Sequence, residues 1–91
     1  MKVRVYLLQE FISVVGDHMI EVEVSEGATV RELLERLPPE LRDKVLGQDG
    51  SIRYPVEIMV NGRRIDFLQG LETRLRPGDR VHISPRALFV V

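Results

Sequence analysis

The sequence predicts an α+β protein in which a mixed sheet of four or five strands packs on one main helix. Three observations support this class. Runs of alternating polar and apolar residues lie near both ends of the chain, a capped helical segment lies between them, and an Asn-Gly pair marks a hairpin in the second half. The chain has the length of one domain, and we expect residues 1–91 to form it.

The first part of the chain predicts two strands joined by a turn of helix. Residues 2–7 and residues 19–24 alternate between polar and apolar side chains, as half-buried strands do. Between them, residues 8–15 carry Phe11 and two valines at helical spacing, and Gly16 is suited to end a short helix. We therefore expect an antiparallel pair of strands at this end of the chain.

Residues 29–37 predict the main helix. Thr29 is a favourable N-cap, and Glu32, three residues later, completes a capping-box pattern. Four apolar residues behind the cap share one face of this helix: Val30, Leu33, Leu34 and Leu37. A pair of prolines then ends the helix, and residues 40–46 are suited to a further short helical piece.

The second half predicts a hairpin and a last strand. Residues 56–60 have the pattern of a strand, Asn61-Gly62 is the strongest two-residue hairpin signal, and residues 63–65 would return antiparallel to the first strand. A Pro-Gly turn at residues 77–78 leads into a final strand at residues 80–84.

The connection between these strands carries several large apolar side chains. We expect Leu71 and Leu75 to be buried although they lie in a loop. We also expect Phe67 and Leu68 to fill the core beneath the helix.

The composition excludes several classes of function. The chain has no cysteine, so it has no disulfide, thiolate metal site or cysteine nucleophile. His18 and His82 lie far apart, and no serine lies in a nucleophile-elbow motif, so we expect neither a bound metal or cofactor nor an enzyme. Charged residues interrupt every apolar run and no signal-peptide pattern is present, so we expect no membrane association and a cytoplasmic protein.

Charge is distributed unevenly along the chain. Residues 1–52 carry six basic and ten acidic side chains, whereas residues 53–91 carry seven arginines and four acids. This mild dipole could steer a protein partner. It lacks the dense basic footprint and the interleaved aromatic residues that nucleic-acid binding needs, so we expect no nucleic-acid partner.

The arginines of the second half form a candidate docking patch for an acidic protein partner. Arg63 and Arg64 follow the hairpin turn, and Arg74, Arg76 and Arg86 flank the last strand. The alternative is that these side chains are only a solvated surface.

These elements and motifs resemble a known family. The helix that begins at Gly-Ala-Thr-Val, residues 27–30, and the order of the strands resemble the ubiquitin-like β-grasp fold. Val60-Asn61-Gly62, then Leu-Glu-Thr-Arg-Leu-Arg-Pro-Gly-Asp-Arg-Val at residues 71–81, then Pro85, are similar to the ordered motifs of the MoaD/ThiS family of small sulfur carriers. The resemblance spans residues 1 to about 85.

The resemblance implies a carrier rather than an enzyme. Members of this family end in a Gly-Gly tail, whose carboxylate is adenylated by a ubiquitin-activating-type enzyme and converted to a thiocarboxylate. The thiocarboxylate delivers sulfur to molybdopterin or thiazole synthesis, and some relatives are instead joined to lysines of other proteins. The partners that it implies are an activating-type enzyme or the large subunit of molybdopterin synthase.

The segment after Pro85 departs from the family pattern. It contains no Gly-Gly and consists of Arg86, Ala87, Leu88, Phe89, Val90 and Val91. We therefore expect a protein that acts by docking or self-association in a sulfur-carrier or molybdopterin-type pathway. The alternative is a sulfur carrier for molybdopterin or thiamin synthesis, or a ubiquitin-like modifier, that is activated at its C-terminus and whose tail is atypical or continues beyond Val91. The apolar tail would pack on its own domain, on a second copy, or on a separate partner.

Overall fold

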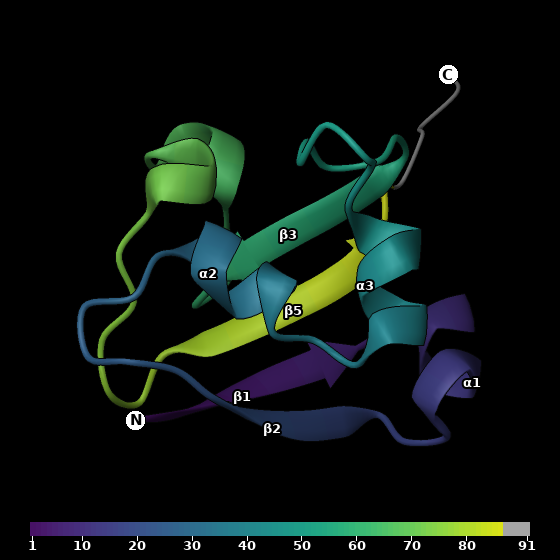
Figure 1. Ribbon diagram of the computed structural model, residues 1–91, viewed down its shortest axis with the longest axis horizontal. Helices are drawn as coiled ribbons and strands as arrows, with labels where there is room; N and C mark the ends of the chain where they lie inside the picture. Colours follow the sequence, from purple (N-terminus) through teal and green to yellow (C-terminus); the bar gives the residue numbers. More distant parts are fainter. Residues whose placement is uncertain (87–91) are drawn as a thin grey trace.

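The computed structural model describes residues 1–86 and contains one five-stranded sheet (Figure 1). Its strands lie in the order β2-β1-β5-β3-β4. Strands β1 and β5 are parallel, and the other neighbouring strands are antiparallel, so the predicted mixed sheet is confirmed. The strands are β1 (Lys2–Leu7), β2 (Met19–Glu23), β3 (Val56–Val60), β4 (Arg63–Arg64) and β5 (Arg80–Pro85).

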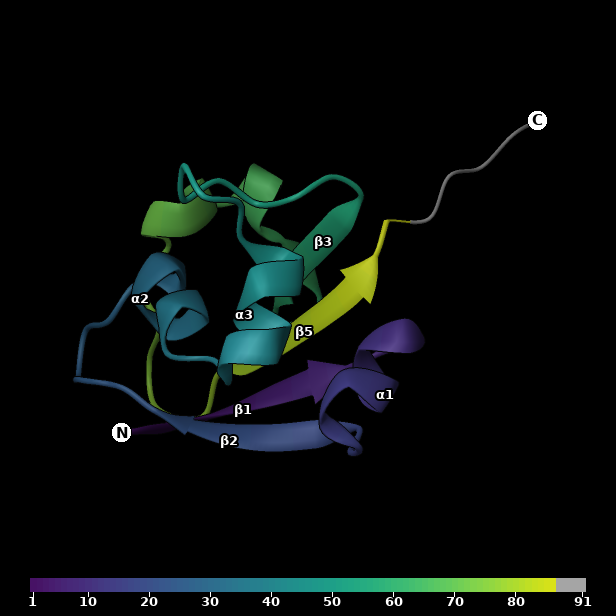
Figure 2. The same ribbon diagram turned by 45° about the vertical axis from the view of Figure 1, so that its right-hand side comes forward.

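The helical layer covers one face of this sheet (Figure 2). Its main part is divided between α2 (Val30–Glu35) and α3 (Pro39–Val45), because Pro38 cannot continue α2, whereas Pro39 is favourable as the first residue of α3. The expected single main helix is therefore shorter than residues 29–37, and the further helical piece is confirmed. The remaining helices are α1 (Glu10–Val15), η1 (Ile65–Phe67) and η2 (Gly70–Glu72).

Local signals set the ends of several elements. The Thr29 hydroxyl accepts a hydrogen bond from the Glu32 backbone N–H at 3.3 Å, as the N-cap prediction requires. Gly16 ends α1 in the left-handed conformation with φ 77°. Asn61 and Gly62 both have positive φ, 52° and 83°, which is the geometry of a type I′ hairpin turn between β3 and β4.

Alternation along the central strands separates an inner face from an outer face of the sheet. The inner face, toward α2 and α3, carries aliphatic side chains, and those on β1 and β5 are at most 2% exposed. On β1 and β5 these are Val3, Val5, Leu7, Val81 and Ile83. Helix residues such as Leu33, Leu34 and Leu41 close the core from above and are fully buried.

Phe67 is not in the core, contrary to the prediction from the sequence. Its side chain is 76% exposed. The chain leaves strand geometry at Ile65, which takes the core position and is only 3% exposed, and the 3-10 turn η1 then carries Phe67 outward. Leu68 is half-buried against the core. Leu75 is buried as expected, whereas Leu71, which was also expected to be buried, is only half-buried.

Candidate functional site

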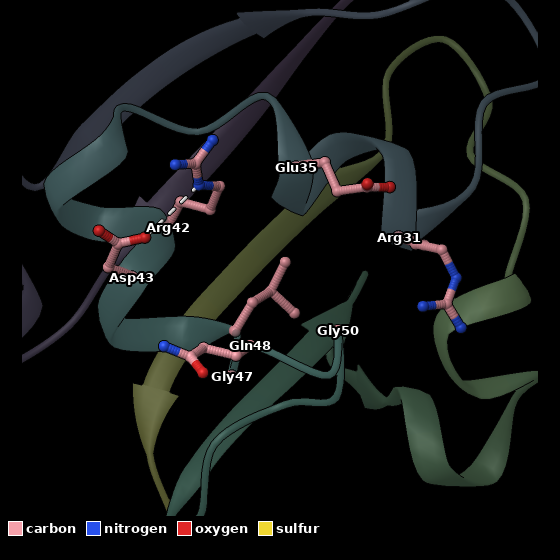
Figure 3. A pocket seen from close by; sticks show the side chains of 8 residues that line it. Arg31, Glu35, Arg42, Asp43, Gly47, Gln48 and Gly50 are labelled. Carbon is pink, nitrogen blue, oxygen red and sulfur yellow. Dashed lines mark ion pairs between the residues drawn. The ribbon is translucent and has the colours of Figure 1, made fainter.

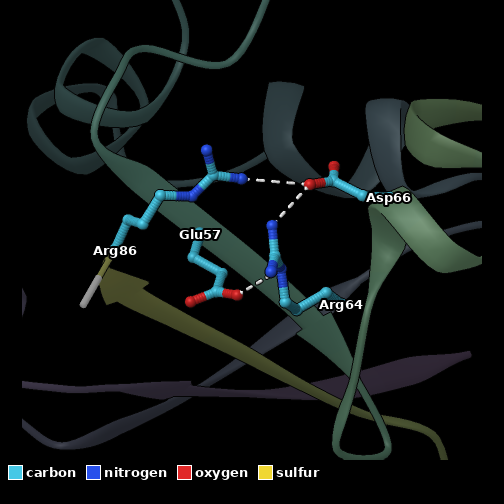
Figure 4. Close-up of polar contacts among 4 residues, drawn as sticks. All are labelled: Glu57, Arg64, Asp66 and Arg86. Atoms are coloured by element: carbon cyan, nitrogen blue, oxygen red, sulfur yellow. Dashed lines mark hydrogen bonds and ion pairs between the residues drawn. The ribbon is translucent and has the colours of Figure 1, made fainter. Parts of the chain in front are cut away.

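Four charged side chains meet where β5 ends (Figure 4). Arg64 Nε lies 2.6 Å from Glu57 Oε1, and Arg64 Nη2 donates to Asp66 Oδ2 at 2.9 Å. Arg86 Nη2 donates to the same Asp66 oxygen at 3.0 Å. We name Glu57, Arg64, Asp66 and Arg86 the ion-pair cluster. Its two cations and two anions balance each other.

The ion-pair cluster fixes the point at which the chain leaves the sheet. Arg86 is held through its side chain by Asp66 and through its backbone N–H, which donates to the Pro55 carbonyl. The Asp66 side chain is 56% exposed, so each of its two ion pairs is worth only about 0.2–1 kcal/mol. Several weak contacts that share atoms nevertheless restrict the position of Arg86.

An exposed aromatic side chain lies next to the ion-pair cluster. The Arg64 guanidinium carbon is 5.3 Å from the centre of the Phe67 ring, within cation–π range. A second aromatic contact lies at the centre of the outer face, where the Tyr6 and His82 rings stack with their centroids 5.0 Å apart. The outer face thus offers aromatic surface together with arginines, a combination that is common at protein interfaces.

The structure divides the arginines of the candidate docking patch. Arg64 and Arg86 come together on Asp66. Arg74 instead donates from Nη1 to the Gly27 carbonyl at 2.9 Å, beside the start of α2. Arg63 lies on β4 and pairs in register with Val60 on β3, and Arg76 lies in the turn before β5. The other predicted site residues, 87–91, lie outside the described residues.

Sequence reasoning missed the acidic members of the ion-pair cluster. The contact between Glu57 and Arg64 could have been predicted from the sequence. The Asn-Gly turn pairs Met59 with Arg64, and Glu57 lies diagonally opposite Arg64 on the same face of the sheet. The contact between Asp66 and Arg86 joins residues far apart in sequence, and no local pattern predicts it.

A polar pocket of about 320 Å³ lies between α2, α3 and the loop after α3 (Figure 3). Arg31 and Arg42 line it together with Glu35 and Asp43. Arg31 Nε pairs with Glu72 Oε1 at 3.0 Å, and Arg42 Nε lies 3.6 Å from Asp43 Oδ1. Because these charges balance, the pocket has no excess charge with which to select an ionic ligand.

Residues 1–86 contain no group of three or more His, Asp or Glu side chains placed to hold a metal ion. Nor does any helix in this part of the chain have the length and apolar character needed to cross a membrane. The surface around the ion-pair cluster therefore stands as the candidate site.

The fold defines the class of protein. A mixed five-stranded sheet with a parallel β1–β5 pair and helices on one face is the ubiquitin-like β-grasp arrangement. The crystal structure of small archaeal modifier protein 1 from Haloferax volcanii is similar, with a TM-score of 0.82 and 25% sequence identity, covering 94% of this chain and 98% of that chain. A chain of the Amycolatopsis orientalis BexX/CysO complex shares the fold at a TM-score of 0.73 and 22% identity, covering 97% and 99%.

Sequence similarity then places the chain in a family. Residues 5–85 match the ThiS family, and the protein belongs to it. A relative from Archaeoglobus fulgidus, named provisionally as a sulfur carrier protein, is 36% identical over 70 residues, which cover 77% of this chain and 80% of that protein. Small archaeal modifier protein 3 from Haloferax volcanii is 33% identical over 88 residues, covering 93% and 95%. The resemblance stated from the sequence is confirmed, and these two relatives are named as a sulfur carrier protein and a small archaeal modifier protein.

Proposed function

We propose that this protein is a non-catalytic member of the sulfur-carrier and modifier family that acts by docking onto other proteins through the surface at the end of β5. One observation carries the proposal. The end of β5 is held by the ion-pair cluster directly beside Phe67, a large apolar side chain that is 76% exposed. An aromatic side chain that remains in water gains free energy when a partner covers it.

The chemistry of this surface suits a protein partner. Aromatic and arginine side chains dominate the binding energy of protein interfaces when they lie at the centre and become desolvated. Phe67 and Arg64 form such a pair, and the surrounding ion pairs provide a polar rim. Arg63 and Arg76 lie near the start of β5 and Arg74 beside the start of α2, so these arginines would take part only where an acidic region of a large partner extends away from the end of β5.

Two kinds of partner fit the family. One is a ubiquitin-activating-type enzyme, and the other is the large subunit of a molybdopterin synthase. Support for the second comes from a similar structure from Pyrococcus furiosus, 29% identical to this chain, that is named provisionally as subunit 1 of a molybdopterin converting factor. Both partners would bring an active site to residues that follow β5.

The test is a calorimetric titration of the activating-type enzyme of the same organism with two variants. We expect Phe67→Ser to weaken binding at least about tenfold, since loss of an interface anchor costs about 2 kcal/mol or more. Ile12→Ser is the matched control, because Ile12 is also an exposed hydrophobic side chain, 38% exposed, but lies on α1. Equal affinities of the two variants would reject docking through Phe67.

A second candidate function is that of a sulfur carrier or modifier activated at its C-terminus. Its support is the similarity to relatives that are named as carrier and modifier. Intact mass spectrometry of the protein isolated from its own cells decides between the two. A terminal Gly-Gly, or a mass gain of one sulfur in place of one oxygen, establishes the carrier, whereas a plain Val91 carboxylate favours docking alone.

Self-association through the apolar tail is the remaining form of the docking hypothesis. Light scattering over a concentration series measures it directly. A monomeric mass that does not change when residues 88–91 are deleted would remove tail-driven assembly.

A further inference from the structure

A hollow of about 430 Å³ lies on the outer face of the sheet, where β1 and β5 begin. Lys2 and Arg4 of β1 and Arg80 of β5 line it with cationic side chains. Gly78 forms part of its wall, and a Cβ built on this residue has no heavy atom within 4 Å, so the space beside it is open. Figure 1 shows that β1 and β5 begin on the side of the N-terminus, away from the end of β5 at which the ion-pair cluster lies.

The register of the sheet brings the three cations together. Arg4 pairs with Arg80 between the parallel strands β1 and β5, and Lys2 precedes Arg4 by two residues on the same face. Neighbouring strands are about 4.8 Å apart, and two residues of a strand span about 6.6 Å. Like charges at this separation repel each other, so the arrangement costs free energy unless an anion lies among them.

The three cations of the hollow form no ion pair within residues 1–86. Two acids, Glu21 and Asp79, also line the hollow. Asp79 is already engaged in the turn before β5, because its two carboxylate oxygens accept hydrogen bonds from the Asn61 side-chain amide at 2.9 Å and from the Arg76 backbone N–H at 2.8 Å. Positive charge is therefore in excess at the hollow, although the whole chain has a formal net charge of −1.

Two further arginines extend the positive charge beyond the hollow. Arg76 lies in the turn before β5, and Arg63 lies on β4 next to the Asn61-Gly62 turn. The Arg80 backbone N–H donates to the Asn61 side chain at 3.0 Å, which places that turn beside the hollow. Neither Arg63 nor Arg76 forms an ion pair in the described part of the chain. The basic surface is thus centred on the start of β5, a position that the docking patch predicted from the sequence did not include.

The geometry favours an extended acidic segment as the occupant of the hollow. Carboxylates at alternate positions of an extended chain lie on one face about 6.6 Å apart, which matches the spacing of Lys2 and Arg4 along β1. Arginine binds a carboxylate through two parallel hydrogen bonds, so Arg4 and Arg80 suit such side chains. A single-stranded nucleic acid is disfavoured, because Glu21 and Glu23 of β2 lie on the same face of the sheet and repel phosphates.

We propose that the hollow formed by Lys2, Arg4 and Arg80 binds an extended acidic segment of a protein partner. The bound carboxylates offset the repulsion between Arg4 and Arg80. The excess positive charge also speeds the encounter, because attraction between opposite charges acts before contact. This site is separate from the surface around Phe67, and the inference does not rest on the proposed function.

Fluorescence anisotropy with a labelled peptide tests the proposal. The probe is a short peptide in which glutamate alternates with threonine, a residue that favours extended structure, and the control peptide carries glutamine in place of glutamate. We expect saturable binding of the acidic peptide alone, with an affinity that falls as the salt concentration rises. In NMR spectra of the unaltered protein, the backbone amide signals of Lys2, Arg4 and Arg80 should shift on addition of this peptide, whereas those of α3 should not.

Two double variants distinguish the hollow from net charge. Arg4→Gln with Arg80→Gln should weaken peptide binding at least about fivefold, as expected for the loss of two exposed arginine–carboxylate contacts. Arg36→Gln with Lys44→Gln removes the same charge from exposed positions of the helical layer and should change the affinity by no more than about twofold. The first double variant should keep or raise the midpoint of thermal unfolding, because it removes a repulsion, so its weaker binding does not come from unfolding.

Several results would overturn the proposal. One is no binding of the acidic peptide, and another is an equal loss of affinity in both double variants, which would mean binding through net charge. Tighter binding of single-stranded polyuridine than of the acidic peptide would assign the hollow to nucleic acid. A dimeric mass in light scattering that becomes monomeric in the variant Arg4→Gln with Arg80→Gln would assign it to a second copy.

The outcome is separable from that of the docking proposal. Phe67→Ser should leave binding of the acidic peptide unchanged, since Phe67 does not line the hollow. Failure of peptide binding therefore leaves docking through Phe67 standing, and equal binding of the Phe67→Ser and Ile12→Ser variants to the activating-type enzyme leaves the hollow standing.

Discussion

The two faces of the sheet differ sharply in composition although the same strands form both. Along β5, Val81 and Ile83 on the inner face are fully buried, whereas Arg80 on the outer face is exposed and His82 is half-buried. Along β3, Ile58 is 2% exposed on the inner face, and Glu57 on the outer face holds Arg64. Each strand therefore contributes apolar side chains to the core on one face and polar side chains to the surface on the other.

The comparison shows how a short chain separates stability from recognition. A domain of this size buries only about 60–65% of its unfolded surface, so almost all of its hydrophobic free energy must come from one side of the sheet. The outer face is then free to carry charged and aromatic side chains. Substitutions on the two faces should consequently have effects of very different size.

The largest expected effect is on the inner face. Ile83→Ala should lower the free energy of unfolding by about 2–5 kcal/mol, because it opens a cavity in a fully buried layer. Arg80→Ala, three residues earlier and exposed, should change it by no more than about 0.5 kcal/mol. Urea denaturation measures both.

If Ile83→Ala is too unstable to study, Ile83→Val replaces it, with an expected loss of about 0.5–1.5 kcal/mol. Similar losses for Ile83→Val and Arg80→Ala would mean that the two faces do not differ in the way described.

An intermediate loss of stability is expected from a substitution in the hairpin turn that places Arg64 on the outer face. Gly62 has φ 83° and no heavy atom within 4 Å of a Cβ built on it, so Gly62→Ala introduces backbone strain without a steric clash. We expect a loss of about 1–2 kcal/mol from the unfavourable left-handed conformation. Thermal unfolding followed by circular dichroism measures this loss, and an unchanged midpoint would argue against the type I′ turn.

A smaller effect is expected within the ion-pair cluster. A double-mutant cycle with Glu57→Ala and Arg64→Ala should give a coupling energy of about 0.2–1 kcal/mol, typical of partly exposed pairs. The coupling should shrink in high salt, because screening weakens exposed charges. A coupling of several kcal/mol would contradict this prediction, because it would mean that the ion-pair cluster stabilises the fold as strongly as contacts on the inner face do.

The smallest effect is expected in the loop after α3. The Ser51 hydroxyl and the Ser51 backbone N–H donate to Asp49 Oδ1 at 2.7 and 3.0 Å, and these bonds lower the pKa of the Asp49 carboxyl. Because the folded pKa is depressed, the contribution to stability is present above the unfolded pKa of about 3.9 and is lost as pH falls through the folded pKa.

The corresponding variant is Ser51→Ala. It should raise the pKa of Asp49 toward its ordinary value, with no measurable change in global stability at neutral pH. A carbon-detected NMR titration of the Asp49 carboxyl checks this, and an unchanged pKa would contradict the hydrogen-bond assignment.

Much of the inner face was predictable from the sequence. Alternation in residues 2–7 and 80–84 identified the central strands, and the Thr29 cap and the Asn61-Gly62 turn located two boundaries correctly. These signals are local, because strand alternation and capping depend on residues that are neighbours in the chain. The resemblance to the family rested on the same kind of local signal, because its motifs are short runs of neighbouring residues.

The outer face was less predictable, because it depends on contacts between distant residues. The expectation that Phe67 is buried followed from its hydrophobicity, but the turn of η1 points it away from the core. The meeting of Arg86 with Asp66 requires β5 to lie beside β3, which only the complete sheet specifies. The prediction of a basic docking patch rested on the number of arginines in the second half of the chain. It did not include the acids, Glu57 and Asp66, that neutralise Arg64 and Arg86.

The position of β5 has a consequence for the making of the protein on the ribosome. Strands β1 and β2 are synthesised first, and β3 and β4 later, but β5 lies between these two antiparallel pairs and is translated last among the described strands. Until residues 80–85 emerge from the exit tunnel, the two pairs have no shared edge, and isolated two-stranded hairpins are marginal in water. Nascent chains arrested before β5 should therefore remain protease-sensitive, and folding should follow translation of this strand rather than accompany that of the earlier ones.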